Sequence, residues 1–418
     1  MLQRELLVYL FKPASMQRWN SFLAPTPLTE LDKHAHKLIA AYVLGQLERQ
    51  AGRGPDWHRI VQASLFEYLR QTILPDIRFE TSEYLMSRAG SHVVRFVCNA
   101  LSPLLQGLST DLQDDLTSYF TVRDSRYDLE RRIVRAASWT ATYWEFQHLV
   151  YPFNSLGTRI EVERTAILRR RQEHETLASM LKLHEMPDGT MNLRSFLGLC
   201  GELRYQSRWP QTPRVPMTSV LGHSYVVALL AFFISDQGEP RYDANRTYNN
   251  VFGALFHDLG EAVTGDIISP VRTAAPAIDS AICDFEQQEL DARVMPCLPQ
   301  DMQAEMRFWV RDVFENRVCR DGQTIVGFSN ADLDNRRADP AEAILDGRLI
   351  GICDDLAALM EAALSIGHGV TSPDIEGGKS RLLARVRRGQ ITSQHEPDPV
   401  LLEYVRKRGF LAPFDYFA

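Results

Sequence analysis

Residues 255–267 read LFHDLGEAVTGDI, an apolar stretch that carries one histidine and three carboxylates. Burying so many ionisable groups costs free energy unless something compensates their charge, and a divalent metal ion would do so. If the stretch is one helix, Glu261 follows His257 by four residues and Asp258 by three, so all three share one face. We therefore predict that this stretch supplies part of a metal site, with further ligands from elsewhere in the chain.

The composition is that of a globular protein, with 418 residues that are 45% hydrophobic and 24% charged, enough for two or three domains. Apolar residues recur at three- and four-residue spacing, as in LIGICDDLAALMEAAL at 349–364, which predicts an all-α fold. The net charge of −7 argues against nonspecific binding to nucleic acid, so no stable nucleic-acid partner is expected.

The cysteines and the apolar runs indicate the cellular location. The six cysteines are scattered and form no CxxC pair, which favours a reduced protein without a disulfide framework. No apolar run approaches the roughly 20 residues that cross a bilayer. We therefore expect a cytoplasmic protein with no membrane partner.

The chain contains an internal repeat of four blocks in the same order. The pairs are QRWN at 17–20 with SRWP at 207–210, HKLIAAYVLG from His36 with HSYVVALLAF from His223, LFEYLRQTILPDI at 65–77 with LFHDLGEAVTGDI, and RRIVRAASWTATYWE at 131–145 with GRLIGICDDLAALME at 347–361. Generic helical spacing would explain the leucine and phenylalanine matches, but not the two Arg-Trp pairs. We therefore predict a tandem duplication, with a helical domain over 1–155, a connecting helix and linker over 156–195, and a second domain over 196–418.

The two copies differ where ionisable side chains gather in the second one. The differing pairs, with the first copy named first, are Glu67 and His257, Tyr68 and Asp258, Gln71 and Glu261, and Ser138 and Asp354. His36 and Asp76 persist, but one imidazole and one carboxylate cannot make a three- or four-ligand metal centre. The first copy is therefore expected to lack a metal site and to have a structural role.

The second copy offers a ligand set drawn from three segments. His223 begins an apolar helix, where a histidine is more often a packed core residue than a ligand. Asp354 and Asp355 lie in an apolar run, and spacing alone does not say which of them points inward. Together, His223, His257, Asp258 and Asp354 form a His₂Asp₂ set, which suits Mn, Fe, Co, Ni or Zn and leaves positions open for water and substrate.

The pattern H…HD…D resembles that of the HD-domain metal-dependent phosphohydrolases. Over about residues 200–370 the chain is similar to the bacterial 5′-deoxynucleotidase branch of that family. It has RWP before the first histidine, HDLGEAVTGDIISPVR where that branch has HDxxExxxGDxxxPVK, and CDDLAA where it has ADxLxA. The resemblance implies two tandem HD-type helical bundles, of which the N-terminal one is degenerate.

The resemblance also implies which residues bind the metal. The implied ligands are His223, His257, Asp258 and Asp354, with Asp354 rather than Asp355 at the last position. The family often has Glu-His-Ser at the first histidine, whereas this chain has Gly222 before His223. That departure removes a carboxylate next to the metal site and puts metal affinity or substrate choice in doubt.

The remaining implied roles concern the substrate. Glu261 would be the general acid or base, and Asp266 would help to hold the substrate. Arg208 would contact the 5′-phosphate, Trp209 would line the sugar pocket, and Arg272 stands where the family has the lysine of PVK. Because the Arg-Trp pair also occurs in the first copy, we expect Trp209 to be partly architectural.

We therefore expect a metal-dependent phosphohydrolase of (deoxy)ribonucleoside 5′-monophosphates, in particular a 5′-deoxynucleotidase. One alternative is a dNTP triphosphohydrolase or another small-phosphoester hydrolase, because Arg204, Arg208 and Arg214 could serve a polyphosphate. The other is a non-catalytic nucleotide sensor or assembly module, against which the intact Glu261 argues. The resemblance to this branch also implies a homodimeric arrangement. The two fused copies are therefore expected to form an intramolecular pseudo-dimer, or the whole chain is expected to form a homo-oligomer.

Overall fold

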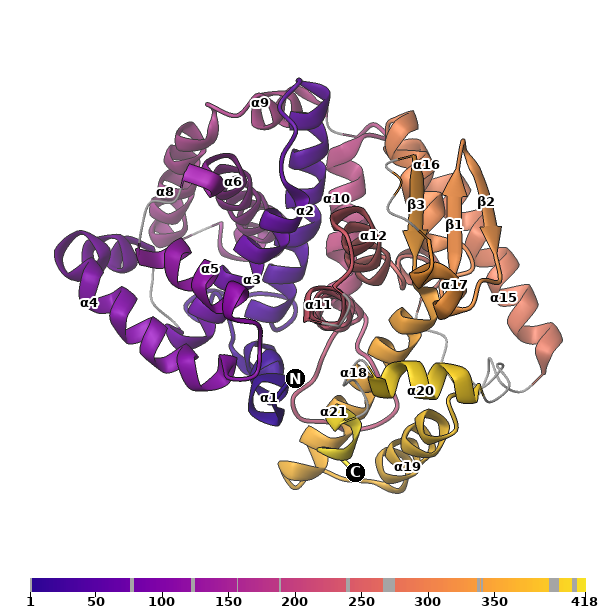
Figure 1. The fold of residues 1–418 in the computed structure, drawn as a ribbon. Helices are drawn as coiled ribbons and strands as arrows, with labels where there is room; N and C mark the ends of the chain where they lie inside the picture. The colour runs from indigo at the N-terminus through magenta and orange to yellow at the C-terminus, as the bar shows by residue number, and fades with distance from the viewer. Residues whose placement is uncertain are drawn as a thin grey trace. The chain divides into compact units, whose positions relative to one another are not determined.

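The fold is helical, as the computed structural model shows for residues 2–75, 79–121, 125–155, 157–187, 189–237, 241–265, 275–336, 339, 341–390, 398–407 and 412–418. Helices and one small three-stranded sheet account for its elements (Figure 1), which confirms the expected all-α class apart from that sheet. The chain divides into two compact units, Leu2–Asp188 and Gly189–Ala418.

The N-terminal unit is built around α2 (Glu30–Gln50), which is buried along almost its whole length and packs against α3, α6 and α9. Thr29 caps α2 by accepting a hydrogen bond from the backbone N–H of Asp32. The other elements are α1 (Arg4–Phe11), η1 (Lys12–Ser15), α3 (Trp57–Ile73), α4 (Phe79–Leu105), α5 (Thr110–Thr121), η2 (Ser125–Tyr127), α6 (Asp128–Glu145), η3 (Phe146–Val150), α7 (Tyr151–Asn154), α8 (Thr158–His174) and α9 (Ala178–Glu185).

The expected connecting segment, 156–195, is not a separate linker, because the boundary between the units falls at 188–189. Helix α8 buries Ile160 and Ile167, and α9 buries Met180 and Leu183. The backbone carbonyl of Ile167 also accepts a hydrogen bond from the indole of Trp139 in α6, at 2.9 Å. The many arginines and glutamates of α8 hid these few apolar anchors in the sequence.

The C-terminal unit is built around α11 (Val220–Gln237), an apolar helix that is buried on all sides and packs against α12 and α18. Its other elements are α10 (Leu193–Glu202), η4 (Leu203–Tyr205), α12 (Ala244–Leu255), α13 (Glu261–Thr264), α15 (Pro276–Glu289), η5 (Leu290–Val294), η6 (Met295–Cys297), α16 (Gln300–Val310), β1 (Arg317–Arg320), β2 (Gln323–Val326), α17 (Asn330–Asp334), β3 (Glu342–Leu345), α18 (Gly347–Gly367), α19 (Pro373–Arg387), α20 (Pro399–Lys407) and α21 (Ala412–Asp415).

Helix α11 is also the one helix among the described residues that is long and apolar enough to cross a membrane. It is 94% buried inside the protein over that window, as the core helix of a globular unit would be. Its length and composition are therefore weak evidence for a membrane span.

The small sheet has the order β2-β1-β3, and both strand pairs are antiparallel. Asp321 and Gly322 form the turn between β1 and β2, and both have positive φ angles, 51° and 75°. Positive φ at both turn residues is what a two-residue type I′ hairpin requires, and Asp-Gly is the usual sequence for it. The strands have four residues each, too few to show a two-residue periodicity in the sequence.

Helix α18 is held in place by the residue that precedes it. The buried carboxylate of Asp346, just before α18, accepts hydrogen bonds from Arg246 Nε at 2.7 Å and Asn250 Nδ2 at 2.8 Å, both in α12. The backbone N–H of Asp346 donates to Asn250 Oδ1 in return, at 2.9 Å. These contacts fix the helix that carries Asp354 against the helix that leads to His257.

The segments before α2 and α11 repeat the same backbone geometry, which supports the duplication. Isolated β-bridges join Gln17 to Thr29 and Ser207 to Ser219. Each segment holds a tryptophan with a left-handed backbone, at φ 58° for Trp19 and 57° for Trp209. Matching hydrogen bonds run from Arg18 N to Leu28 O and from Arg208 N to Thr218 O.

This repeated geometry corrects the alignment of the two buried helices. Lys33 N bonds to Thr29 O, as His223 N bonds to Ser219 O, so Lys33 and not His36 corresponds to His223. The sequence alignment was wrong by three residues. Apolar helices repeat every three to four residues, so a shift of about one turn preserves most of the apolar matches.

Candidate metal centre

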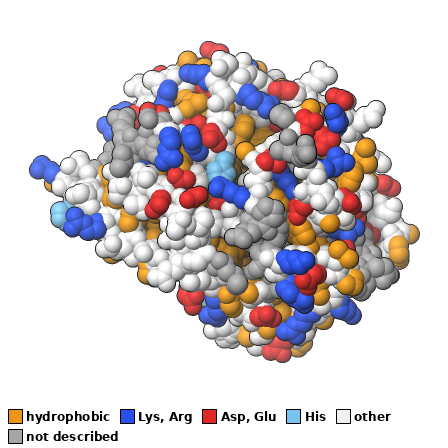
Figure 2. Space-filling model, in the orientation of Figure 1, with side chains coloured by type: hydrophobic (Ala, Val, Ile, Leu, Met, Phe, Trp, Pro, Cys, Tyr) orange, Lys and Arg blue, Asp and Glu red, His pale blue; other side chains and the backbone are white. Residues whose placement is uncertain are grey.

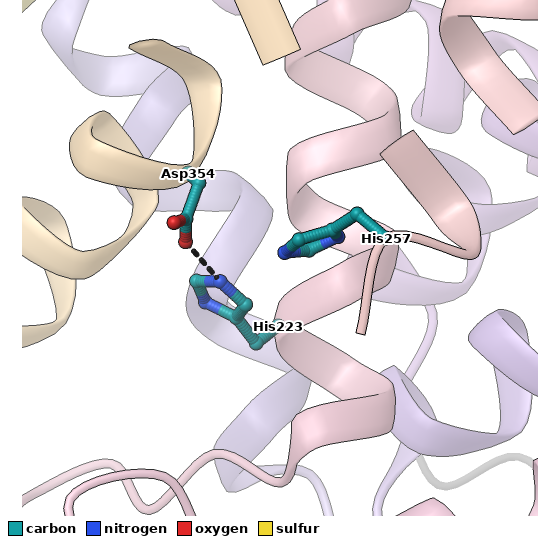
Figure 3. Close-up of side chains that lie close together, drawn as sticks. All are labelled: His223, His257 and Asp354. Carbon is teal, nitrogen blue, oxygen red and sulfur yellow. Dashed lines mark hydrogen bonds and ion pairs between the residues drawn. The ribbon is translucent and has the colours of Figure 1, made fainter. Parts of the chain in front are cut away.

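His223 lies in the first turn of α11, with both ring nitrogens next to carboxylates. Its Nε2 is 2.7 Å from Oδ1 of Asp354 in α18 (Figure 3), and its Nδ1 is 3.4 Å from Oε1 of Glu361. The side chain is fully buried. A carboxylate beside Nδ1 favours a proton on that nitrogen and leaves Nε2 for the site, which is how metal-binding histidines are commonly oriented.

His257 lies just beyond the end of α12, which stops at Leu255. Residues 256–260 form a run of tight turns, and α13 begins only at Glu261, so the single helical face expected for residues 257–261 is wrong. The turn itself orients the ring, because Nδ1–H of His257 donates to the carbonyl of Ala254 at 2.7 Å. A carbonyl can only accept, so Nε2 is the nitrogen left to bind a metal.

The two adjacent aspartates in α18 take different directions. Asp354 meets His223, whereas Asp355 is buried and pairs with Arg385 in α19. Asp354 is thus the carboxylate at the site, as the resemblance implied.

One atom each of His223, His257 and Asp354 lies within 4.8 Å of the others, and this is the one such group of potential metal ligands among the described residues. Figure 3 shows the three side chains converging from α11, from the end of α12 and from α18. The fourth expected ligand, Asp258, lies beside them, with Oδ2 3.2 Å from His257 Nε2. Neither of these two buried atoms makes a hydrogen bond of acceptable geometry.

The charges around the site fit a divalent cation. Among the described residues, the carboxylates of Asp258, Asp354, Glu361 and Glu261 all raise the pKa of Arg208, although burial opposes that shift. Arg214 is a second guanidinium beside this group, 3.9 Å from Glu361. The excess of negative charge and the mixed histidine and aspartate donors match the ligand chemistry of a transition metal.

The same charges shift the pKa values of the ligands. Burial would lower the pKa of His223, but its contacts with Glu361 and Asp354 prevail and raise it to about 9. Burial would raise the pKa of Asp354, but the hydrogen bond from His223 and the nearby positive charges lower it instead. The metal-free site thus holds protons on imidazole that a metal would have to displace.

Glu261 is the first residue of α13, and its side chain is buried. Gln206 fixes this turn, because its Nε2 donates to the backbone carbonyl of Glu261 at 2.7 Å. The carboxylate is close enough to raise the pKa of Arg208 together with Asp258 and Asp354. Asp266 and Arg272, the other two expected site residues, lie outside the described residues.

Arg208 lies between the candidate metal ligands and a pocket. Its guanidinium is 3.8 Å from Asp258 Oδ2 and 3.8 Å from Asp354 Oδ1. The pocket has a volume of about 810 Å³. It is lined by Tyr205, Gln206, Ser207, Arg208, Trp209, Pro210, Gln211, Thr212, Pro213, Arg214, Met217 and Gly265. Small-molecule sites commonly have volumes in this range.

Trp209 is held rigidly at the pocket wall. Its indole N–H donates to Oε2 of Glu361 at 2.9 Å. Its ring lies against Gly378 of α19, where an added Cβ would come within 2.7 Å of the indole. The same arrangement in the first copy, where Trp19 donates to Glu145 at 3.0 Å, indicates that part of this role is architectural.

Glu361 is the site residue that the sequence reasoning missed. It is fully buried in α18 and contacts Trp209, His223 and the hydroxyl of Thr218, which donates to Oε1 at 2.5 Å. It places a carboxylate beside His223, although Gly222, the residue before that histidine, carries none. The repeat held a signal for it, because Glu361 ends the block that pairs with a block ending in Glu145.

Comparison with known proteins places the site in a family. A family model described as "HD domain" matches residues 200–378, which contain all four expected ligands. Residues 200–378 therefore form an HD domain. The 5′-deoxynucleotidases of Pectobacterium atrosepticum and Pasteurella multocida are 26% and 25% identical to this chain, over 30% and 28% of its length. The matches span 62% and 59% of those relatives, so the chain covers about three fifths of their length.

A solved HD-domain phosphohydrolase from Listeria innocua also matches, at 18% identity and a TM-score of 0.35. The match covers 53% of this chain and 93% of that one. So low a score adds nothing to the assignment of residues 200–378 to the HD family.

In the N-terminal unit, other side chains occupy the positions of the HD ligands. Lys33 corresponds to His223, Glu67 to His257, Tyr68 to Asp258 and Ser138 to Asp354; these four residues are the remnant site. Burial lowers the pKa of Lys33 to about 8, with partial compensation by Glu30. A lysine ammonium at the position of a ligand repels a metal ion, so the remnant site is built against cation binding.

Charge on the visible surface follows no single sign. Figure 2 shows basic and acidic side chains interspersed over one face of the molecule. The local charges at the metal site, rather than a broad surface field, are therefore what would select an anionic substrate.

Proposed function

We propose that the C-terminal unit hydrolyses the 5′-phosphate of deoxyribonucleoside monophosphates. The observation that carries this proposal is the convergence of His223, His257 and Asp354 beside Arg208, an arginine that also lines an open pocket. Membership of the HD family and the names of the bacterial relatives support it.

The proposed metal is a divalent transition ion, held by the four HD residues His223, His257, Asp258 and Asp354. When bound, it lowers the pKa of a coordinated water and neutralises phosphoryl oxygens. The two imidazoles fit this role because His257 donates Nδ1–H to a carbonyl and His223 has a carboxylate at Nδ1, which leaves both Nε2 atoms for the site.

The chain's own residues supply binding and proton transfer. The guanidinium of Arg208 offers parallel N–H donors that match two phosphate oxygens. Glu261, buried and adjacent, takes the proton that water loses as it attacks phosphorus and returns it to the leaving 5′-oxygen. The bond from phosphorus to that oxygen breaks, and a nucleoside and orthophosphate leave.

The arrangement of arginines favours a monophosphate over a triphosphate. Of the three arginines between 204 and 214, only Arg208 faces the ligand group among the described residues. Arg204 is buried, and its Nε donates to the carbonyl of Gly201. Arg214 pairs with Glu361 and donates a hydrogen bond to Thr218. A triphosphate would need more cationic contacts than this.

A metal-by-nucleotide activity screen with identification of the products tests the proposal. We expect orthophosphate and a nucleoside from deoxyribonucleoside 5′-monophosphates in the presence of Mn, Co or a related ion. Tripolyphosphate from dNTPs would favour the triphosphohydrolase instead. Binding of a nucleotide without hydrolysis under any metal would favour a sensor.

A further inference from the structure

The two units use equivalent arginines in opposite ways. In the N-terminal unit, Arg18 donates to Glu145 at 3.0 Å and to Glu30 at 2.8 Å, so two carboxylates hold it. In the C-terminal unit, the side chain of Arg208 makes no hydrogen bond to any described residue, and its buried Nε has no partner. The carboxylate that corresponds to Glu145 is present there as Glu361, yet Arg208 does not bond to it.

Substitutions around the arginine account for this difference. Glu30, which holds Arg18, corresponds to the apolar Val220. Ala24 and Leu28 correspond to Arg214 and Thr218, which give the C-terminal unit a cation and a hydroxyl in their place. Each of these three changes either removes a hydrogen-bond acceptor from the arginine at position 208 or adds a partner for the carboxylate of Glu361.

The new partners meet at Glu361. Thr218 donates to its Oε1 at 2.5 Å, and Arg214 NH1 is 3.9 Å from its Oε2. Arg214 also donates to Thr218 Oγ1 at 2.7 Å and to the backbone carbonyl of Arg208 at 3.3 Å. A fully buried carboxylate needs a nearby positive charge, and Arg214 supplies one that is itself buried.

We propose that Arg214 is a positioning residue, which occupies Glu361 and so leaves the guanidinium of Arg208 turned toward the metal ligands, where it can bind a phosphate. Without Arg214, Glu361 would lose its buried guanidinium partner, and Arg208 stands where Arg18, the arginine that binds Glu145, stands in the N-terminal unit. This inference rests on the proposed function only in taking Arg208 as the phosphate contact.

A double-mutant cycle on inorganic phosphate binding tests the proposal without any turnover. Phosphate affinity is measured by calorimetry on the metal-loaded full chain, for the wild type, Arg214→Met, Arg208→Ala and the double variant. We expect Arg214→Met to weaken phosphate binding about 10- to 100-fold, the range for one charge-assisted hydrogen bond. In the Arg208→Ala background, the same change should weaken binding less than about 3-fold, because the group through which Arg214 acts is already absent.

Two further variants separate positioning from packing. Arg214→Lys keeps a positive charge and should retain most of the phosphate affinity. Arg214→Gln keeps hydrogen-bond donors but no charge, and it replaces Arg214→Met in the double-mutant cycle if the methionine variant does not fold. Arg317 is equally buried, bonds to the backbone carbonyls of Asp312 and Trp309, and serves as the matched control. Arg317→Met is expected to lower stability but to leave phosphate affinity within about 2-fold, as no phosphate contact is lost.

The outcomes are distinct. Equal losses of affinity in both arginine backgrounds would overturn the proposal, as would an unchanged affinity in Arg214→Met or a wild type that binds no phosphate. A wild type that binds phosphate through Arg208 but hydrolyses no nucleotide would contradict the proposed function and leave this inference standing.

Discussion

Asp354→Asn is the substitution that isolates the metal from the rest of the fold. An asparagine keeps the size of the side chain and an oxygen that can accept the 2.7 Å hydrogen bond from His223, so the variant should still fold, and its own metal-free melting temperature is the reference for the metal-induced shift. The substitution removes the carboxylate charge from the group of three atoms that lie within 4.8 Å. Metal affinity is therefore the quantity that should change.

The magnitude follows from binding linkage. A metal at 100 times its dissociation constant raises the free energy of unfolding by about 2.7 kcal/mol. Loss of a direct ligand should weaken binding at least as much as loss of a residue behind it, about 100-fold. At the same metal concentration, the stabilisation then falls to about 0.4 kcal/mol. For a unit of this size, the metal-induced rise in melting temperature should fall from about 5–10 °C to about 1–2 °C.

The assay is thermal unfolding of the full chain with and without metal, monitored so that the two units are resolved. Ser138 holds the position of Asp354 in the N-terminal unit, so Ser138→Asn is the matched control and should leave the metal-induced shift at its wild-type value. An Asp354→Asn variant with a wild-type shift would refute the ligand assignment. If Ser138→Asn abolished the metal-induced rise in melting temperature, the metal would bind in the N-terminal unit instead.

Two other substitutions probe the proton chemistry. Glu261→Gln should keep one metal per chain by elemental analysis but lose at least about 100-fold in turnover, because it removes the proposed acid and base; unchanged turnover would rule out that role. Burial and the charge of Lys33 lower the pKa of Lys37 to about 7 in the N-terminal unit. The unfolded state therefore binds more protons between pH 7 and the pKa of a free lysine, and stability rises with pH over that window. Lys37→Met should raise the free energy of unfolding at pH 7 and remove up to about 1.4 kcal/mol per pH unit of that rise, whereas an unaltered slope would contradict the depressed pKa.

The candidate metal ligands could be predicted from the sequence because they depend on residue types in a fixed order. His223, His257 and Asp354 could be named from three separate blocks, and the structure brings them together. The backbone conformation that brings His257 to the other two residues could not be predicted. The break between α12 and α13 depends on a turn in which His257 bonds to Ala254, and nothing in LFHDLGEAVTGDI departs from helical periodicity.

Glu361 was missed, and Arg214 was considered only as a polyphosphate contact, for a related reason. Each is an ordinary charged residue in sequence, and its role depends on which buried group it meets across the fold. The internal repeat was the one feature that could have found them, through the Glu145 and Ala24 positions. The three-residue error that paired His36 with His223 obscured the comparison, since it hid the lysine that replaces the first metal ligand.

The central claim is that a metal in the C-terminal unit enables hydrolysis of a nucleotide phosphate. The most direct measurement is orthophosphate release from a deoxyribonucleoside 5′-monophosphate by chain stripped of metal and then titrated with Mn or Co. We predict that release is absent without metal, rises in proportion to bound metal, and saturates at one ion in the site of His223, His257, Asp258 and Asp354. No release at full occupancy of that site, or equal release from Asp354→Asn, would contradict the claim.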